Sequence, residues 1–124
     1  MANDGIGGLY LETHNWGKTV AFRVGLGFEL EFETDHHSGQ LRHPAGGPWL
    51  FVAERPEGQV LETYPIVLTG DSATFVPPAA GTVDSPFVAQ HWDVVEMFVR
   101  DPDARRVSVQ APLPDGVDAP AGHN

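Results

Sequence analysis

The sequence contains no cysteine, which excludes a disulfide framework, a thiol nucleophile and a thiolate metal site. It also lacks any apolar run near the roughly 20 residues that a membrane-spanning helix needs. The first residues, MANDGIGG, have neither the basic nor the apolar segment of a secretory signal. We therefore expect a cytoplasmic protein that does not contact a membrane.

Basic residues are scarce: seven Lys and Arg stand against seventeen Asp and Glu, for a formal net charge of −10. Such a surface repels nucleic-acid phosphates and attracts cationic small molecules. Motifs for common catalytic chemistry are also missing: the sequence has no G-x-S-x-G elbow, no glycine-rich phosphate loop and no H-E-x-x-H. Nucleic acid is therefore excluded as an expected partner, and the case for catalysis is weak.

The stretch from residue 9 to residue 28 predicts a strand, a helix and a second strand. Residues 9–14 alternate between apolar and polar side chains, as in a half-buried strand. Asn15 is a good N-cap for the helix that follows, since its side chain can accept from a free amide of the first turn. Gly25 and Gly27 are placed to end that helix.

Further along the chain, apolar alternation predicts strands rather than helices. Pro77 and Pro78 limit any second helix, which would begin after Asp71 or Ser72, to about two turns. The expected strands cover residues 28–34, 39–42, 48–54, 60–68, 87–92, 94–100 and 105–110.

The resulting order, β-α-β-β-β and then β-(short or missing α)-β-β-β, indicates an internal duplication of roughly 55 residues. We expect one domain over residues 1–124, because each half alone is too small to be stable. Its first module spans about residues 6–54, its second about 60–111, and residues 112–124 form a flexible tail.

Three segments together resemble the vicinal oxygen chelate superfamily, also called the glyoxalase/bleomycin resistance/dioxygenase fold. They are NWGKTVAF with GLGFELEFE, then HPAGGPWLFVAE, then HWDVVEMFVRDPDARRVSVQAP. The resemblance implies an α+β fold in which two βαβββ modules form a curved mixed sheet around a cup, with the second helix short or missing. It also implies a homodimer. Ala104 departs from the pattern, since the family has glycine at that turn position.

In enzymes of this family a divalent metal is held by side chains of the first, fourth, fifth and eighth strands. The matching positions here are Gly8, Glu54, Tyr64 and Ser108, and Glu54 alone supplies a carboxylate. The resemblance therefore implies a metal-independent protein with no cofactor. The alternative is a displaced divalent metal site using Glu54 and His91, with His14 as a further candidate, in a metal-dependent lyase, isomerase or dioxygenase.

Metal-free members of the superfamily bind antibiotics, and the sequence has suitable residues for a binding groove. Alternate residues of a strand share one face, which places Gly8, Tyr10 and Glu12 together, and likewise Arg106, Ser108 and Gln110. Flat aromatic rings stack on planar ligands. The side chains that we expect to contact the ligand are Tyr10, Glu12, Trp49, Phe51, His91, Trp92 and Ser108.

The predicted function is small-molecule binding: sequestration of an aromatic or cationic antibiotic, giving antibiotic resistance without catalysis. Within the superfamily, the sequence most resembles the metal-free members that bind antibiotics. A third possibility is a groove that binds another protein. Of the remaining aromatic residues, Phe22, Phe28 and Phe32 are expected in the core.

Overall fold

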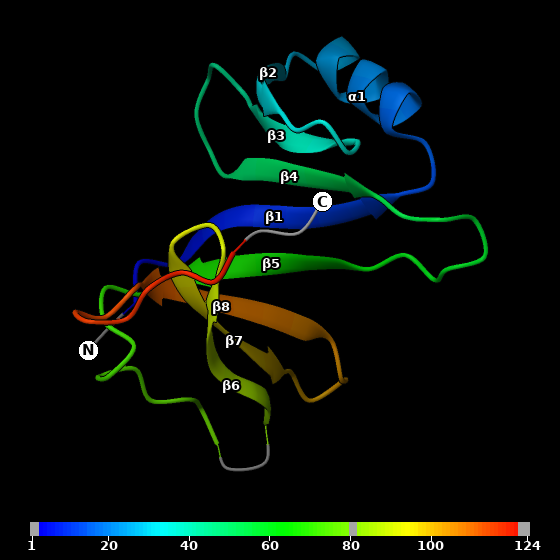
Figure 1. Ribbon diagram of the computed structural model, residues 1–124. Coiled ribbons are helices and arrows are strands. Elements are labelled where there is room, and N and C mark those ends of the chain that lie inside the picture. The colour runs from blue at the N-terminus through cyan, green and yellow to red at the C-terminus, as the bar shows by residue number, and fades with distance from the viewer. Residues whose placement is uncertain (1–2, 80–81, 122–124) are drawn as a thin grey trace. The chain divides into compact units, whose positions relative to one another are not determined.

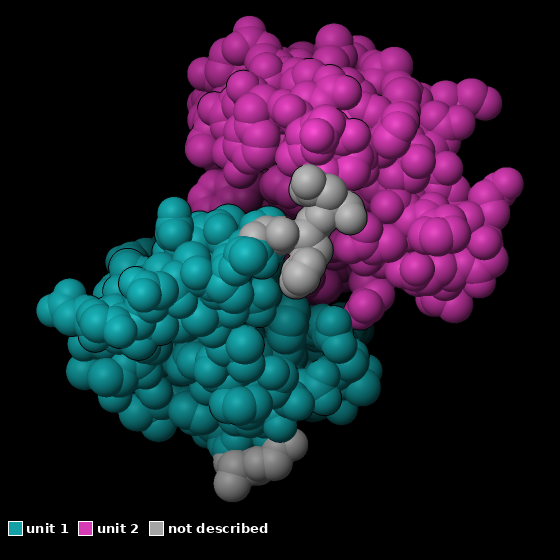
Figure 2. Space-filling view, in the orientation of Figure 1, with its two compact units in different colours: residues 1–6, 65–124 teal, residues 7–64 magenta. Residues whose placement is uncertain are grey.

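The computed structural model describes residues 3–79 and 82–121, which form two compact units (Figures 1 and 2). Unit 2 comprises residues 7–64, and unit 1 comprises residues 1–6 with 65–124. Among the described residues, no helix is both long and apolar enough to cross a membrane. The elements are β1 (Ile6–Thr13), α1 (Trp16–Gly25), β2 (Glu29–Glu33), β3 (Ser38–Arg42), β4 (Trp49–Glu54), β5 (Thr63–Leu68), β6 (Val83–Gln90), β7 (Val94–Arg100) and β8 (Arg106–Pro112).

Unit 2 is a mixed sheet of order β2-β3-β4-β1 with α1 packed on one side (Figure 1). Strands β1 and β4 are parallel, whereas β2 and β4 both run antiparallel to β3. The parallel pair needs a long connection, and α1 with the β2–β3 hairpin supplies it. This is the predicted βαβββ module, with strand ends within a few residues of those expected.

Helix α1 begins where the sequence predicted. The Asn15 side chain accepts from the Lys18 amide at 3.0 Å, and the helix ends before Gly27, whose φ is +97°. Trp16 is 7 % exposed and packs with Leu41, which is fully buried. The core of unit 2 therefore lies between α1 and the sheet.

Two of the three phenylalanines that we expected in the core are exposed. Phe22 is 63 % exposed and Phe32 is 48 % exposed, whereas Phe28 does pack against the core of unit 2. The helix buries the side that carries Trp16 and Val20, and Phe22 lies away from that side. Phe32 lies on the sheet face opposite α1, so the prediction of a core position was wrong for both residues.

Unit 1 repeats the sheet order of unit 2 without the helix. Its strands follow the order β5-β8-β7-β6, with β5 and β8 parallel and the other neighbours antiparallel. Within the described part of residues 69–82 there is a turn at residues 72–74 and no helix. This agrees with the expectation of a short or missing second helix, since Pro77 and Pro78 prevent helical backbone hydrogen bonds there.

The division between the two compact units falls after Tyr64, inside β5. Described residues 113–121 contain no helix or strand, and the last residues of the predicted tail, 122–124, lie outside the described range.

The β7–β8 hairpin closes through a turn at Asp101, Pro102, Asp103 and Ala104. Ala104 has a φ of +66°, the left-handed region that glycine adopts without strain. Its amide donates to the Asp101 carbonyl at 2.8 Å, and the Asp101 side chain accepts from the Arg105 amide at 2.9 Å. Alanine at this position therefore adopts the left-handed conformation at some conformational cost.

Replacing Ala104 with glycine should stabilise the protein by about 0.5–1 kcal/mol, because relief of the left-handed strain exceeds the entropy that glycine adds to the unfolded chain. Chemical denaturation measures the change. The matched control is Ala21→Gly at an exposed position of α1, which should destabilise the protein by about 0.5–1 kcal/mol. A loss of stability in A104G would contradict the assigned strain.

Candidate functional site

The sheet face of unit 2 that points away from α1 carries a row of aromatic side chains. Phe32, Gln40, Phe51 and Tyr10 are partners in register across β2, β3, β4 and β1. The Phe51 ring centre lies 6.3 Å from that of Phe32 and 6.4 Å from that of Tyr10. Tyr10 stacks on Tyr64 at 4.7 Å. We call these four rings, together with the indole of Trp49, the aromatic face.

The indole of Trp49 covers Gly8, its register partner on β1. A Cβ built on Gly8 would overlap the indole atoms, so the absence of a side chain there is what allows this position. The Arg42 guanidinium lies over the same indole, 5.8 Å from its centre. The indole of Trp49 therefore packs directly against the backbone of Gly8.

Beside the aromatic face, three side chains form a hydrogen-bonded network. The Tyr10 hydroxyl donates to Glu12 Oε2 at 2.7 Å, and Arg55 Nε donates to the same oxygen at 3.1 Å. Arg55 also donates to the Tyr10 hydroxyl at 2.9 Å, and the Glu62 amide donates to Glu12 Oε1 at 2.9 Å. Both oxygens of this carboxylate thus have partners within unit 2.

This network also sets the protonation of Tyr10. Burial raises the pKa of the Tyr10 phenol above its usual value, and the hydrogen bond to Glu12 raises the pKa further. Arg55 opposes these effects without cancelling them. Tyr10 is therefore a neutral hydrogen-bond donor to Glu12, and its ring stacks on those of Phe51 and Tyr64.

Glu54 and His14 have structural partners at the start of α1. Glu54 Oε2 accepts from the Trp16 amide at 2.8 Å, a favourable place for a carboxylate because free amides point out of a helix N-terminus. His14 Nδ1 lies 3.2 Å from the Arg55 carbonyl oxygen.

Ser108 belongs to a buried polar cluster in unit 1 that sequence reasoning missed. Its hydroxyl donates to Glu96 Oε2 at 2.6 Å, and Gln110 Nε2 donates to the same oxygen at 3.0 Å. All three residues are at most 9 % exposed. Glu96 joins Ser108 and Gln110 because β7 pairs with β8, with Glu96 opposite Gln110, and no local pattern shows this pairing.

His91 and Trp92 lie in the turn between β6 and β7 and are exposed. Their rings meet edge to face with centres 5.0 Å apart. They belong to unit 1, whereas Tyr10, Glu12, Trp49 and Phe51 gather on unit 2. Their assignment to a ligand site stays a prediction.

The side chains in the family's metal-ligand positions fit a metal poorly. Gly8 is covered by Trp49, Tyr64 stacks on Tyr10, Ser108 is bonded to Glu96, and Glu54 holds the helix amide. Across residues 3–79 and 82–121, no three His, Cys, Asp or Glu side chains gather as a metal site would require.

No protein-family model matches the sequence, and no curated protein sequence matches it. Solved structures do match. A glyoxalase/bleomycin resistance protein/dioxygenase superfamily member from Vibrio splendidus 12B01 has a TM-score of 0.61 at 15 % identity, covering 84 % of this chain and 96 % of that one. The 2,2',3-trihydroxybiphenyl 1,2-dioxygenase of Sphingomonas wittichii strain RW1 has a TM-score of 0.51 at 14 % identity, covering 86 % of this chain and 42 % of that one.

The chain therefore has the α+β fold of the glyoxalase/bleomycin resistance/dioxygenase superfamily, as the sequence resemblance predicted. At these identities the similarity shows the fold alone. A shared fold does not determine a shared function.

Placing a methyl group on Gly8 should displace the indole of Trp49. We expect Gly8→Ala to cost about 1 kcal/mol of stability through overpacking, and to make Trp49 more accessible to acrylamide quenching. The matched control is Gly25→Ala, where an added Cβ meets nothing within 4 Å. Unchanged quenching in G8A would contradict the contact between Trp49 and β1.

The raised pKa of Tyr10 predicts a pH dependence of stability. Above about pH 10 the phenol ionises in the unfolded chain but not in the folded one, so the free energy of unfolding falls as pH rises. Denaturation from pH 8 to 11 should show a steeper fall for the wild type than for Tyr10→Phe. Parallel profiles for the two proteins would show that the pKa of Tyr10 is not raised by folding.

Proposed function

We propose that this protein binds a planar aromatic small molecule on the aromatic face of unit 2 and sequesters it without chemical change. The observation that carries the proposal is the register-matched row of Phe32, Phe51 and Tyr10 beside the indole of Trp49. Aromatic side chains on neighbouring strands give a ligand several rings to stack on at little conformational cost.

The polar groups beside this face favour stacking over ion pairing. Glu12 accepts hydrogen bonds from Tyr10, Arg55 and the Glu62 amide, so its charge is already compensated. Attraction of a cationic ligand would come from the formal net charge of −10, which acts over longer distances. A planar cationic antibiotic combines both properties, and the superfamily is named in part for bleomycin resistance.

Metal independence is part of this proposal, because the side chains in the ligand positions have other partners. The alternative is a metal-dependent enzyme of the same fold that uses Glu54 and His91. Glu54 would have to give up the Trp16 amide to bind an ion. A stoichiometric divalent metal retained after purification and dialysis would favour this alternative.

We further propose that the protein is a cytoplasmic homodimer. Analytical ultracentrifugation can test its oligomeric state.

Binding to the aromatic face can be measured by tryptophan quenching and by the shift in melting temperature with bleomycin and a panel of planar antibiotics. Phe51→Ala should weaken binding about three- to tenfold, as expected for loss of one stacked ring. Phe22→Ala is the matched control, because it removes an exposed ring of unit 2 away from this face. Expression in a sensitive bacterium should raise the inhibitory concentration of any antibiotic that binds.

Equal weakening by both substitutions would contradict a site on the aromatic face. Turnover of a bound compound, detected as a new product by mass spectrometry, would contradict sequestration.

A further inference from the structure

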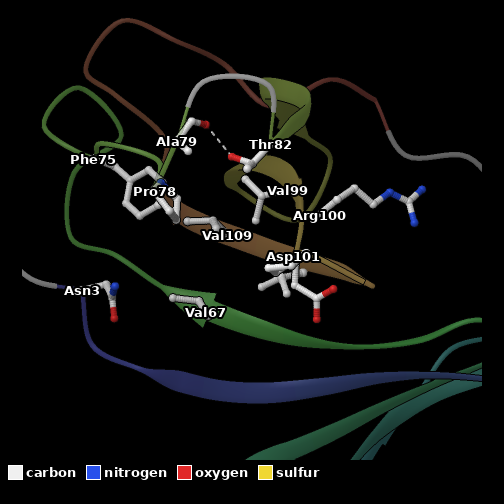
Figure 3. Close-up of a pocket in the computed structure, with 12 residues that line it drawn as sticks. Asn3, Val67, Phe75, Pro78, Ala79, Thr82, Val99, Arg100, Asp101 and Val109 are labelled. Carbon is white, nitrogen blue, oxygen red and sulfur yellow. Dashed lines mark hydrogen bonds between the residues drawn. The ribbon is translucent and has the colours of Figure 1, made fainter. Parts of the chain in front are cut away.

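Unit 1 contains an apolar pocket of about 440 Å³ on one face of its sheet (Figure 3). Val67, Val99 and Val109 form its floor, and Phe75 and Pro78 lie at its side. These residues come from β5, β7, β8 and the segment that follows β5. The volume is roughly three times that of an engineered protein cavity that binds benzene, and it falls within the range of small-molecule sites.

The pocket arises where unit 1 lacks a helix. In unit 2 the row Leu9, Leu50 and Leu41 is covered by α1, whose Trp16 and neighbouring side chains fill the space. In unit 1 the corresponding row is Val67, Val109 and Met97.

That row of unit 1 is covered by Phe75, which meets Phe87 edge to face at 6.0 Å. A single ring from an irregular segment fills less volume than a helix, and this leaves the hollow.

The charged and polar residues at the rim of the pocket form hydrogen bonds and ion pairs with other residues of unit 1. Arg100 pairs with Asp84 at 3.2 Å and donates to the Ala104 carbonyl at 3.0 Å. The Asp101 carboxylate accepts from the Arg105 amide at 2.9 Å, and the Thr82 hydroxyl donates to the Ala79 carbonyl at 2.6 Å. A ligand in this pocket therefore gains by burying apolar surface and not by forming an ion pair.

We infer that this pocket is a second ligand site, separate from the aromatic face, that takes a neutral apolar molecule of about two to three fused or linked rings. It lies wholly within unit 1, and the inference does not depend on the function proposed for unit 2. A bound ligand would fill the volume that α1 side chains fill in unit 2, and would stabilise unit 1.

The neutral fluorescent probe N-phenyl-1-naphthylamine tests this site. We expect saturable binding at micromolar concentration, with a rise in probe fluorescence and in melting temperature. Val107→Phe adds a ring to the wall of the pocket and should weaken binding about tenfold. The matched control is Val76→Phe, at a neighbouring exposed position that does not line the pocket, and it should bind as the wild type does.

A second pair of variants separates the two sites and guards against misfolding. Ala79→Phe reaches the pocket from its exposed rim and should also weaken binding, which keeps the test valid if Val107→Phe is unfolded by circular dichroism. Phe51→Ala removes a ring of the aromatic face, so probe that Phe51→Ala still binds and the pocket variants lose is probe bound in the pocket. The inference is overturned if the wild type does not bind the probe, or if both pocket variants bind it as the wild type does.

Discussion

The candidate site depends on the hydrogen bonds and the ion pair that the Glu12 carboxylate forms. Its side chain is 7 % exposed, and its two oxygens accept from Tyr10, Arg55 and the Glu62 amide. The contacts join β1 to the segments that follow β4 and precede β5. A buried charge with every partner in place organises its surroundings, whereas loss of one partner leaves an uncompensated group. The same contacts hold the Tyr10 ring between Phe51 and Tyr64.

The two units show what a helix contributes to an otherwise similar sheet. Both have the same strand order and the same parallel pair, yet α1 closes the core of unit 2 and an irregular segment covers unit 1. Pro77 and Pro78 contribute to this difference, because neither has the backbone N–H that would continue a helix beginning near Ser72. Duplicated modules can therefore diverge by a local change, one retaining a packed core and the other acquiring a hollow.

Local signals predicted much of the fold. The N-cap at Asn15, the glycines after α1 and the strand alternation depend on residues close in sequence, so they could be found without a structure. The site was predicted less completely. Tyr10, Trp49 and Phe51 were expected to contact a ligand and do share one face, but Phe32 was expected in the core. The sheet face on which the Phe32 side chain lies depends on how β2 pairs with β3 and on the bulge between Leu30 and Phe32. Alternation along the sequence does not show either feature.

The sequence by itself determined the order of the helix and strands, the duplication, the limit on a second helix and the lack of a side chain at position 8. These follow from residue identity and short-range periodicity. Tertiary structure decided that Trp49 covers Gly8, that Glu12 is held by Arg55 from 43 residues away, and that Ser108 is bound to Glu96. Such contacts join distant strands, and the register of a sheet determines them while composition does not. Gly8 thus came to lie under the indole of Trp49 only when β4 paired with β1.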